Sequence, residues 1–417
     1  MSKNNLGNVK SNIFSLGFLQ IFNYSYPFIF YPFITVALGP EKFGLISFST
    51  SFIGYFIIII DYGFNLTATQ KIALSRNNRN KQQYIFNSVI TAKLFLFFLS
   101  FIILLITIFS IDSLKPEKEL YLIVFAGVFS NILVPIWFFQ GIEKMKLITL
   151  LNVIPKLIII PFVIMVIKSP DDYLLFATIT STAMIFSGVI SMLFLNLKFG
   201  INYRISSLKN VVMELKYGFD VFLSGILTSI YTITSVFALA FYVDKAVVGF
   251  YFLAERIVKV LSSIFTPVIN AFYPFLVKLS NIDSRKTTNI NNKILIFSSI
   301  SMLMISISLY TFSDIIVTLF ADSEFEESAN LLKILAPYPL IITIAKHLSV
   351  NYIIVNGYKN ILLKIYSIVA SIAAVSFIIM IPKYGAQGTA FSVIFVELTA
   401  TLMMLWFCTV KGLFNAK

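Results

Sequence analysis

The stretch Leu94–Ile111, with the sequence LFLFFLSFIILLITIFSI, decides the fold of this chain because its 18 residues include no charged side chain. A helix rises about 1.5 Å per residue, so about 20 apolar residues cross the roughly 30 Å hydrocarbon core of a bilayer. Leu94–Ile111 therefore predicts a membrane-spanning helix. Two further apolar runs, Phe56–Ile60 and Ile368–Ile381, predict spans near the two ends of the chain.

The composition of the whole chain extends this prediction. Of its 417 residues, 58% are hydrophobic and 12% are charged, and the mean hydropathy is +0.89. A soluble domain is about half apolar and a quarter charged. At roughly 30 to 35 residues per span and loop, the length predicts about twelve spans and no sizeable soluble domain. The predicted spans lie near 12–38, 44–65, 84–111, 120–140, 147–167, 173–196, 218–240, 247–275, 294–312, 330–355, 362–381 and 388–410.

The positions of Lys and Arg predict the orientation. With a cytoplasmic N-terminus, 20 of the 32 basic residues fall in cytoplasmic segments and six in segments on the opposite face. Basic loops stay in the cytoplasm, so both termini are expected there. The net charge of +13 is then a topology signal. Nucleic-acid binding is the weaker interpretation, because the basic residues are spread over short loops and form no single patch.

The residue types that carry most enzyme chemistry are scarce. The chain has one Cys, Cys408, and one His, His347, which excludes an internal disulfide and a His-rich metal site. We expect Cys408 to be buried and inert, and His347 to be hydrogen-bonded within its helix. No ATP-binding G-x-x-x-x-G-K-[ST] motif, no H-E-x-x-H motif and no acidic D-x-D motif in a cytoplasmic loop is present. The sequence therefore predicts neither an enzyme nor a cofactor.

Two pairs of short stretches indicate an internal repeat. Leu38–Leu45 resembles Tyr242–Phe250, since both place an acid and a Lys before a short apolar link and a Gly. Gln140–Lys144 and Asn356–Lys359 end the fourth and tenth predicted spans in a similar way. Six spans separate the copies, so the halves have the same orientation. We predict two six-helix lobes, 1–205 and 206–417, related by a parallel repeat and able to rock about a central cavity.

Ionisable residues at membrane depth are costly and are candidates for function. The basic candidates for a cationic substrate-binding cavity are Lys93, Lys156, Arg256, Lys259 and Lys346. The acidic candidates for ion coupling or gating are Asp61, Glu255 and Glu397.

Each candidate also has a structural alternative. Glu255 and Lys259 are one helical turn apart and can simply pair. Lys93 and Lys346 can extend toward the cytoplasmic face. Lys156 lies between two prolines and can bond to the carbonyls that they free, while Asp61 can cap its helix. Arg256 has no local acidic partner of this kind, which favours a cavity.

Polar residues also gather on the first and seventh predicted spans. In lipid, such residues should face protein or water, so they indicate a hydrated cleft, with hydrogen bonding between helices as the alternative. The residues are Gln20, Asn23, Tyr24, Ser25, Tyr26, Ser224, Thr228, Ser229, Tyr231, Thr232 and Thr234.

Four stretches make the chain resemble the Wzx-type O-antigen and polysaccharide flippases. These belong to the superfamily of the multidrug and toxic-compound exporters and the lipid II flippase. The stretches are LGPEKFG at Leu38–Gly44, DYGFNLTATQ at Asp61–Gln70, PIWFFQGIEKMK at Pro135–Lys146 and NAFYP at Asn270–Pro274. The second and third are the most specific to O-antigen transporters. The resemblance implies an all-α membrane protein of twelve helices in two lobes, like the multidrug exporters.

The same resemblance implies the activity and partners. The expected substrate is an undecaprenyl-diphosphate-linked oligosaccharide, moved from the cytoplasmic to the periplasmic leaflet of a bacterial inner membrane. A gradient of H+ or Na+ would drive transport, and other glycan-assembly membrane proteins would be further partners. A small-molecule exporter of the same fold is the alternative, although six basic residues in the spans favour an anionic substrate. A membrane enzyme of glycan assembly is disfavoured, since no outer loop is large enough for a catalytic domain.

Overall fold

The computed structural model describes residues 3–266, 268, 269, 272, 276, 279 and 282–414, and its regular structure there is helical throughout. Seven helices, or eight if one bent pair counts as a span, are long and apolar enough to cross a membrane. This confirms the all-α membrane fold. The count of twelve spans stays a prediction, and the NAFYP stretch falls outside the described residues apart from Phe272.

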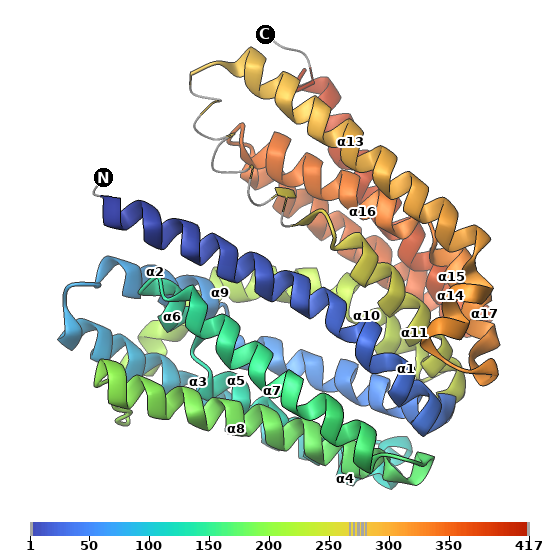
Figure 1. Cartoon of the computed structure of the whole chain (residues 1–417), viewed down its shortest axis with the longest axis horizontal. Coiled ribbons are helices and arrows are strands. Elements are labelled where there is room, and N and C mark those ends of the chain that lie inside the picture. The colour runs from blue at the N-terminus through green and yellow to red at the C-terminus, as the bar shows by residue number, and fades with distance from the viewer. Residues whose placement is uncertain are drawn as a thin grey trace. The chain divides into compact units, whose positions relative to one another are not determined.

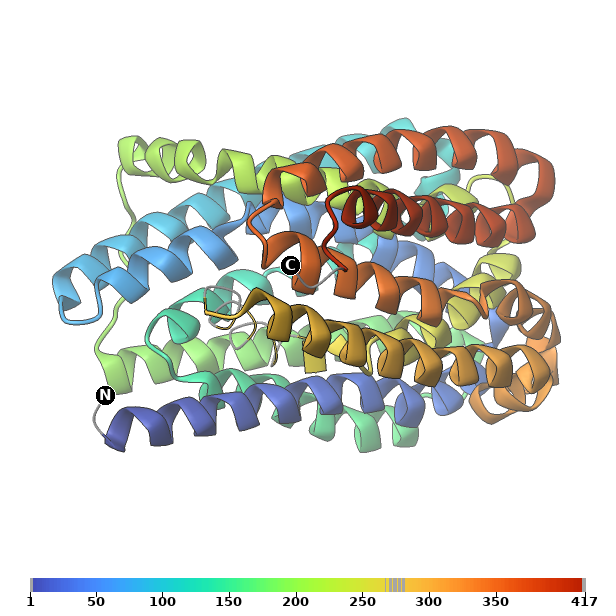
Figure 2. The same cartoon turned by 90° about the horizontal axis from the view of Figure 1, so that it is seen from above.

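Two long helices each join a pair of predicted spans across a glycine. Helix α1, Lys3–Asp61, is non-helical at Gly39 (φ 65°, ψ 172°), and helix α17, Lys359–Val410, is non-helical at Gly385 (φ 53°, ψ −130°). Such positive φ angles are accessible to glycine at low cost. In α17 the Ser376 hydroxyl donates to Ser392 Oγ at 2.8 Å, and Figure 2 shows the two red arms side by side. Each helix therefore folds back as two arms.

The chain divides into two compact units. Unit 1 contains Met1–Asn23 and Ser49–Ile226, and unit 2 contains Tyr24–Phe48 and Leu227–Lys417. The predicted lobes, 1–205 and 206–417, were defined by the internal repeat, whereas the two units are defined by which residues contact each other. The division into two repeated lobes therefore stays a prediction.

Helices of the fourth to sixth predicted spans pack closely in unit 1. Helix α8 lies along α4 and α7 (Figure 1). Gly127 of α4 allows the close approach, because a Cβ atom there would lie 2.8 Å from Ser181 Oγ. The unit comprises parts of α1 and α9 (Leu208–Thr232) with α2 (Phe64–Leu74), α3 (Arg79–Ser110), η1 (Asp112–Glu117), α4 (Lys118–Val128), α5 (Ser130–Leu133), α6 (Ile136–Gly141), α7 (Met145–Val166), η2 (Pro170–Asp172) and α8 (Tyr173–Phe199).

Unit 2 is built around α11, which contacts α15, α16 and α17. Helix α13 runs alongside α16 (Figure 1). Besides the remaining parts of α1 and α9, the unit comprises α10 (Thr234–Leu239), α11 (Lys245–Ser262), α13 (Ser284–Thr311), α14 (Ser313–Phe320), η3 (Ser323–Phe325), α15 (Glu326–Leu335), α16 (Tyr338–His347), the π-helical η4 (Leu348–Ile354) and α17.

The two stretches aligned as a repeat, Leu38–Leu45 and Tyr242–Phe250, contact each other inside unit 2. A Cβ atom on Gly44 would lie 1.7 Å from the Lys245 carbonyl oxygen, and one on Gly249 would lie 2.4 Å from the Pro40 carbonyl oxygen. Only glycine at both positions permits this crossing of α1 and α11. The crossing anchors the start of α11, the helix that carries most of the basic candidates in this unit.

Candidate substrate-binding site

Helix α11 carries its accessible basic side chains on one line. Its core-facing residues include Val248, Tyr251, Ala254, Val258 and Ser262, whereas Phe252, Arg256 and Lys259 are less buried. These three follow a spacing of four and then three residues, which places them on one face of the helix.

The accessible line of α11 therefore carries two basic residues. Arg256 is exposed, and the Lys259 side chain retains 30% of its accessibility. Lipid is an unfavourable environment for an exposed Arg. The line should therefore border a hydrated space.

Glu255 holds Lys259 in place behind this line. Its carboxylate is 4% exposed and lies 2.9 Å from Lys259 Nζ. The Ser235 hydroxyl donates to the same carboxylate at 2.8 Å, and the Tyr251 hydroxyl donates at 3.3 Å. The pairing allowed by the four-residue spacing is thus present, and the buried acid is well satisfied.

Arg256 differs from its neighbours in having no carboxylate within 4.0 Å among the described residues. Its guanidinium carbon lies 5.9 Å from the centre of the Phe252 ring, at the limit of a cation–π contact. The guanidinium therefore keeps its hydrogen-bonding capacity for an anionic ligand.

A second pair of candidates lies beside the first in unit 2. Lys346 Nζ on α16 donates to Thr266 Oγ1 at 2.9 Å. Glu397 on α17 is 8% exposed and is close enough to both Lys259 and Lys346 to interact electrostatically with them. Four of the predicted residues are thereby brought together, with Lys259 acting on both Glu255 and Glu397, and Lys346 on Glu397.

Unit 1 brings two further candidates together. Lys93 is 1% exposed, and its Nζ lies 2.7 Å from Asp61 Oδ1 and 3.2 Å from the Asn131 carbonyl oxygen. Asp61 is at the end of α1 and its side chain keeps 29% of its accessibility. A buried ammonium needs such a partner, because leaving it unpaired is strongly destabilising.

Lys156 lies elsewhere in unit 1. Its Nζ donates to Asn23 Oδ1 at 2.6 Å, which joins α7 to the polar face predicted for the first span. The roles predicted for Lys93 and Lys156 remain predictions. On the polar faces, the side chains of Tyr24, Ser224, Thr228, Tyr231 and Thr232 fall outside the described part of the structure.

The sequence analysis missed one buried ion pair. Lys71 Nζ lies 2.6 Å from Glu214 Oε2 and 4.2 Å from the centre of the Tyr217 ring. Glu214 is 5% exposed on α9. The hydrophobic residues around Glu214 were a signal of burial, but no sequence signal linked it to a lysine 143 positions earlier.

The single Cys and the single His of the chain are both buried. Cys408 is buried, and His347 is 0% exposed with one ring nitrogen 2.9 Å from Ser298 Oγ and the other 3.2 Å from Asn351 Nδ2. Among the described residues, no cluster of His, Cys, Asp and Glu could hold a metal ion.

The long apolar helices define a polytopic membrane protein. A model of the family described as "Polysaccharide biosynthesis protein" matches residues 9–280, and the chain belongs to this family. The resemblance to the Wzx-type family is thereby confirmed, and the chain is a membrane transporter and not an enzyme.

Two relatives match almost the whole chain, and both carry the name "Putative O-antigen transporter". The relative from Escherichia coli (strain K12) is 29% identical over 417 residues, covering 98% of each chain. The relative from Shigella dysenteriae is 28% identical over 404 residues, covering 95% of this chain and 99% of its own.

Solved structures share the fold at lower sequence identity. An inward-facing multidrug resistance MATE family transporter of the MOP superfamily superposes with a TM-score of 0.76 at 15% identity, covering 95% of each chain. The lipid II flippase MurJ superposes with a TM-score of 0.72 at 16% identity, covering 96% of this chain and 88% of its own.

Proposed function

We propose that this protein moves undecaprenyl-diphosphate-linked O-antigen, or a related oligosaccharide unit, from the cytoplasmic to the periplasmic leaflet by alternating access. The family match and the names of the two relatives support this class of cargo. The protein has twelve helices in two lobes, 1–205 and 206–417. It lies in a bacterial inner membrane with both termini in the cytoplasm.

The observation that carries the proposal is the basic line on α11. A diphosphate is a strong anion, and a guanidinium can bind it through two parallel hydrogen bonds. Arg256 is exposed and has no described acidic partner, so it is the primary diphosphate contact. Lys259 and Lys346 extend the same positive region, and Lys156 and Lys93 supply cations in unit 1.

Ion coupling follows from the partners of these lysines. Asp61 pairs with Lys93, Glu255 pairs with Lys259, and Glu397 interacts with Lys259 and Lys346. H+ or Na+ bound at one of these carboxylates would weaken its hold on the lysine. Ion binding therefore changes the charge that the cavity presents to the diphosphate, so the two ligands are linked.

Deletion of the gene and analysis of lipid-linked glycans tests the function. We expect the complete oligosaccharide on its carrier to accumulate and the surface glycan to disappear. Normal surface glycan in the deletion strain would overturn the proposal, and accumulation of incomplete oligosaccharides would indicate an enzyme of assembly instead.

Complementation of the deletion strain tests the site. We expect Arg256→Gln to reduce export at least about tenfold at normal protein abundance, because one charge-assisted contact to the diphosphate is lost. Arg285→Gln on α13 is the matched control, since Arg285 is also an exposed arginine at a helix. Equal export by both variants would remove Arg256 from the site.

A further inference from the structure

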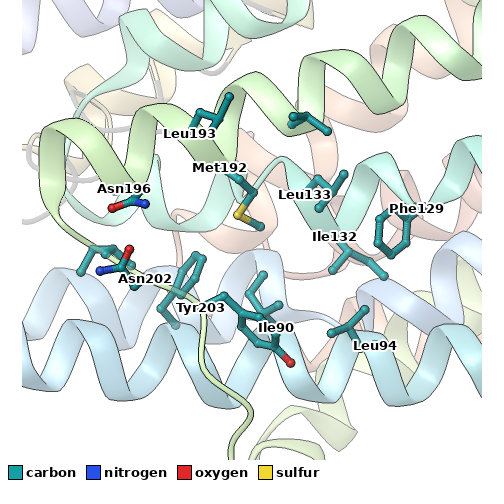
Figure 3. Close-up of a pocket in the computed structure, with 13 residues that line it drawn as sticks. Ile90, Leu94, Phe129, Ile132, Leu133, Met192, Leu193, Asn196, Asn202 and Tyr203 are labelled. Atoms are coloured by element: carbon teal, nitrogen blue, oxygen red, sulfur yellow. The ribbon is translucent and has the colours of Figure 1, made fainter.

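Unit 1 contains an apolar pocket that the proposed transport path does not use. It has a volume of about 390 Å³ and lies between α3, α5, α8 and the segment that follows α8. Figure 3 shows Phe129 and Leu94 at one end and the carboxamides of Asn196 and Asn202 at the other. The pocket is therefore amphipathic along its length, as a lipid is.

Residues 201–206 form one wall of the pocket, and every second residue of this segment is hydrogen-bonded to α3. The backbone N–H groups of Asn202, Arg204 and Ser206 donate to the side chains of three α3 residues, at 3.0, 3.1 and 3.0 Å. The acceptors are Gln83 Oε1, Asn87 Oδ1 and Thr91 Oγ1.

The spacing of the three backbone donors matches the spacing of the three side-chain acceptors on α3. Four helical residues rise about 6 Å, and two extended residues advance about 6.6 Å. The Tyr203 side chain is fixed as well, since its hydroxyl lies 3.3 Å from Thr91 Oγ1. The pocket wall is thus a built element of unit 1.

Basic residues adjoin the polar end of the pocket along the chain. Residues 196–209 include Lys198, Arg204 and Lys209 but no acid. Arg204 is exposed, and Arg79 Nη2 donates to the Gly200 carbonyl oxygen at 3.0 Å beside it. The carboxamides of Asn196 and Asn202 are available as well, since neither is hydrogen-bonded to another residue that the structure describes.

We propose that this pocket binds an anionic phospholipid of the bilayer, with one acyl chain among Ile90, Leu94, Phe129 and Met192 and the phosphate at Asn202 and Arg204. Basic residues beside a groove between membrane helices attract anionic headgroups. Val189 and Leu193 of α8 line the pocket and are exposed, so a chain can enter past them. The volume suits a single acyl chain and is far too small for a long polyprenyl tail, which separates this site from the proposed cargo.

Tryptophan fluorescence offers a direct test. The chain has two Trp residues. Trp137 is 0% exposed, and its ring centre lies 6.0 Å from that of Phe86, which lines the pocket. Trp406 is 67% exposed and would respond to any lipid, so the experiment uses full-length protein carrying Trp406→Phe. Bromine on an acyl chain quenches Trp only at short range.

The purified protein is placed in phosphatidylcholine vesicles containing brominated phosphatidylglycerol or brominated phosphatidylcholine. We expect brominated phosphatidylglycerol to quench Trp137 at lower mole fraction, by about fivefold for each basic residue at the mouth. Lys198→Gln with Arg204→Gln should remove most of this preference, and the matched pair Arg285→Gln with Lys286→Gln in unit 2 should retain it. Met192→Phe, which fills the pocket, should reduce quenching by both lipids.

Three outcomes would overturn the proposal. Equal quenching by the two lipids would show that the headgroup is not recognised, and absence of quenching would show that no acyl chain enters. Stronger quenching by a brominated polyprenyl phosphate would assign the pocket to the carrier lipid. An unchanged Trp137 emission spectrum without bromine verifies that each variant is folded, and normal glycan export by the variants would leave the proposed transport function standing.

Discussion

At the scale of single residues, the charges in the membrane differ in how completely they are enclosed. Lys93 is 1% exposed and depends on Asp61, whereas Asp61 keeps 29% of its side-chain accessibility and can be solvated by water. Arg256 is exposed and has no acidic partner among the described residues. In this structure the Lys93 ammonium is therefore held by its counterion, whereas the Arg256 guanidinium is accessible to a ligand.

The Lys93–Asp61 pair yields an asymmetric prediction. Asp61→Asn leaves a buried ammonium without its counterion and should destabilise the protein by about 3–5 kcal/mol. Lys93→Met leaves a carboxylate that water can reach, so its cost should be smaller. Thermal unfolding in detergent, with Asp61→Asn/Lys93→Met as the third variant, measures the difference. If Lys93→Met costs as much as Asp61→Asn, burial does not decide the energetics of this pair.

At the scale of elements, glycine decides how closely helices approach. Gly249 lies against the Pro40 carbonyl oxygen in the crossing of α1 and α11, whereas the nearest atom to a Cβ on Gly225 of α9 would be 4.0 Å away. The same substitution therefore meets backbone atoms in one helix and an ordinary van der Waals contact with a side chain in the other.

Alanine substitutions at these two glycines should change the free energy of unfolding in opposite directions. Gly225→Ala should stabilise the protein by up to about 1 kcal/mol, because alanine restricts the unfolded chain and favours helix. Gly249→Ala should destabilise it by about 1–3 kcal/mol through forced separation of the helices. Unfolding midpoints of the two variants provide the comparison, and stabilisation by Gly249→Ala would show that the crossing is loose.

At the scale of the whole molecule, the distribution of basic residues predicts which loops face the cytoplasm. Cys408 is the sole cysteine in the sequence and is buried, so Cys408→Ser provides a cysteine-free protein. In that background, a membrane-impermeant maleimide should label Lys115→Cys in intact spheroplasts and should label Arg285→Cys only after lysis. The reverse pattern would invert the predicted topology.

The sequence by itself determined the membrane environment and the helical class, because transfer of apolar side chains into lipid depends on local composition. Its short stretches such as Asp61–Gln70 and Pro135–Lys146 carried the family resemblance. It also identified the Glu255–Lys259 pair, since residues one turn apart on a helix are always neighbours. The basic residues that it singled out within the spans include every lysine and arginine of the candidate site.

Tertiary structure alone decided which charges meet and which remain accessible. Lys93 and Asp61 are 32 positions apart, and Lys71 and Glu214 are 143 apart, so their contacts depend on how helices pack. The accessible line of α11 arises for the same reason, because neighbouring helices cover all but one face. Hydropathy places a charge within a helix, but only packing determines whether that charge is paired, buried or available to a ligand.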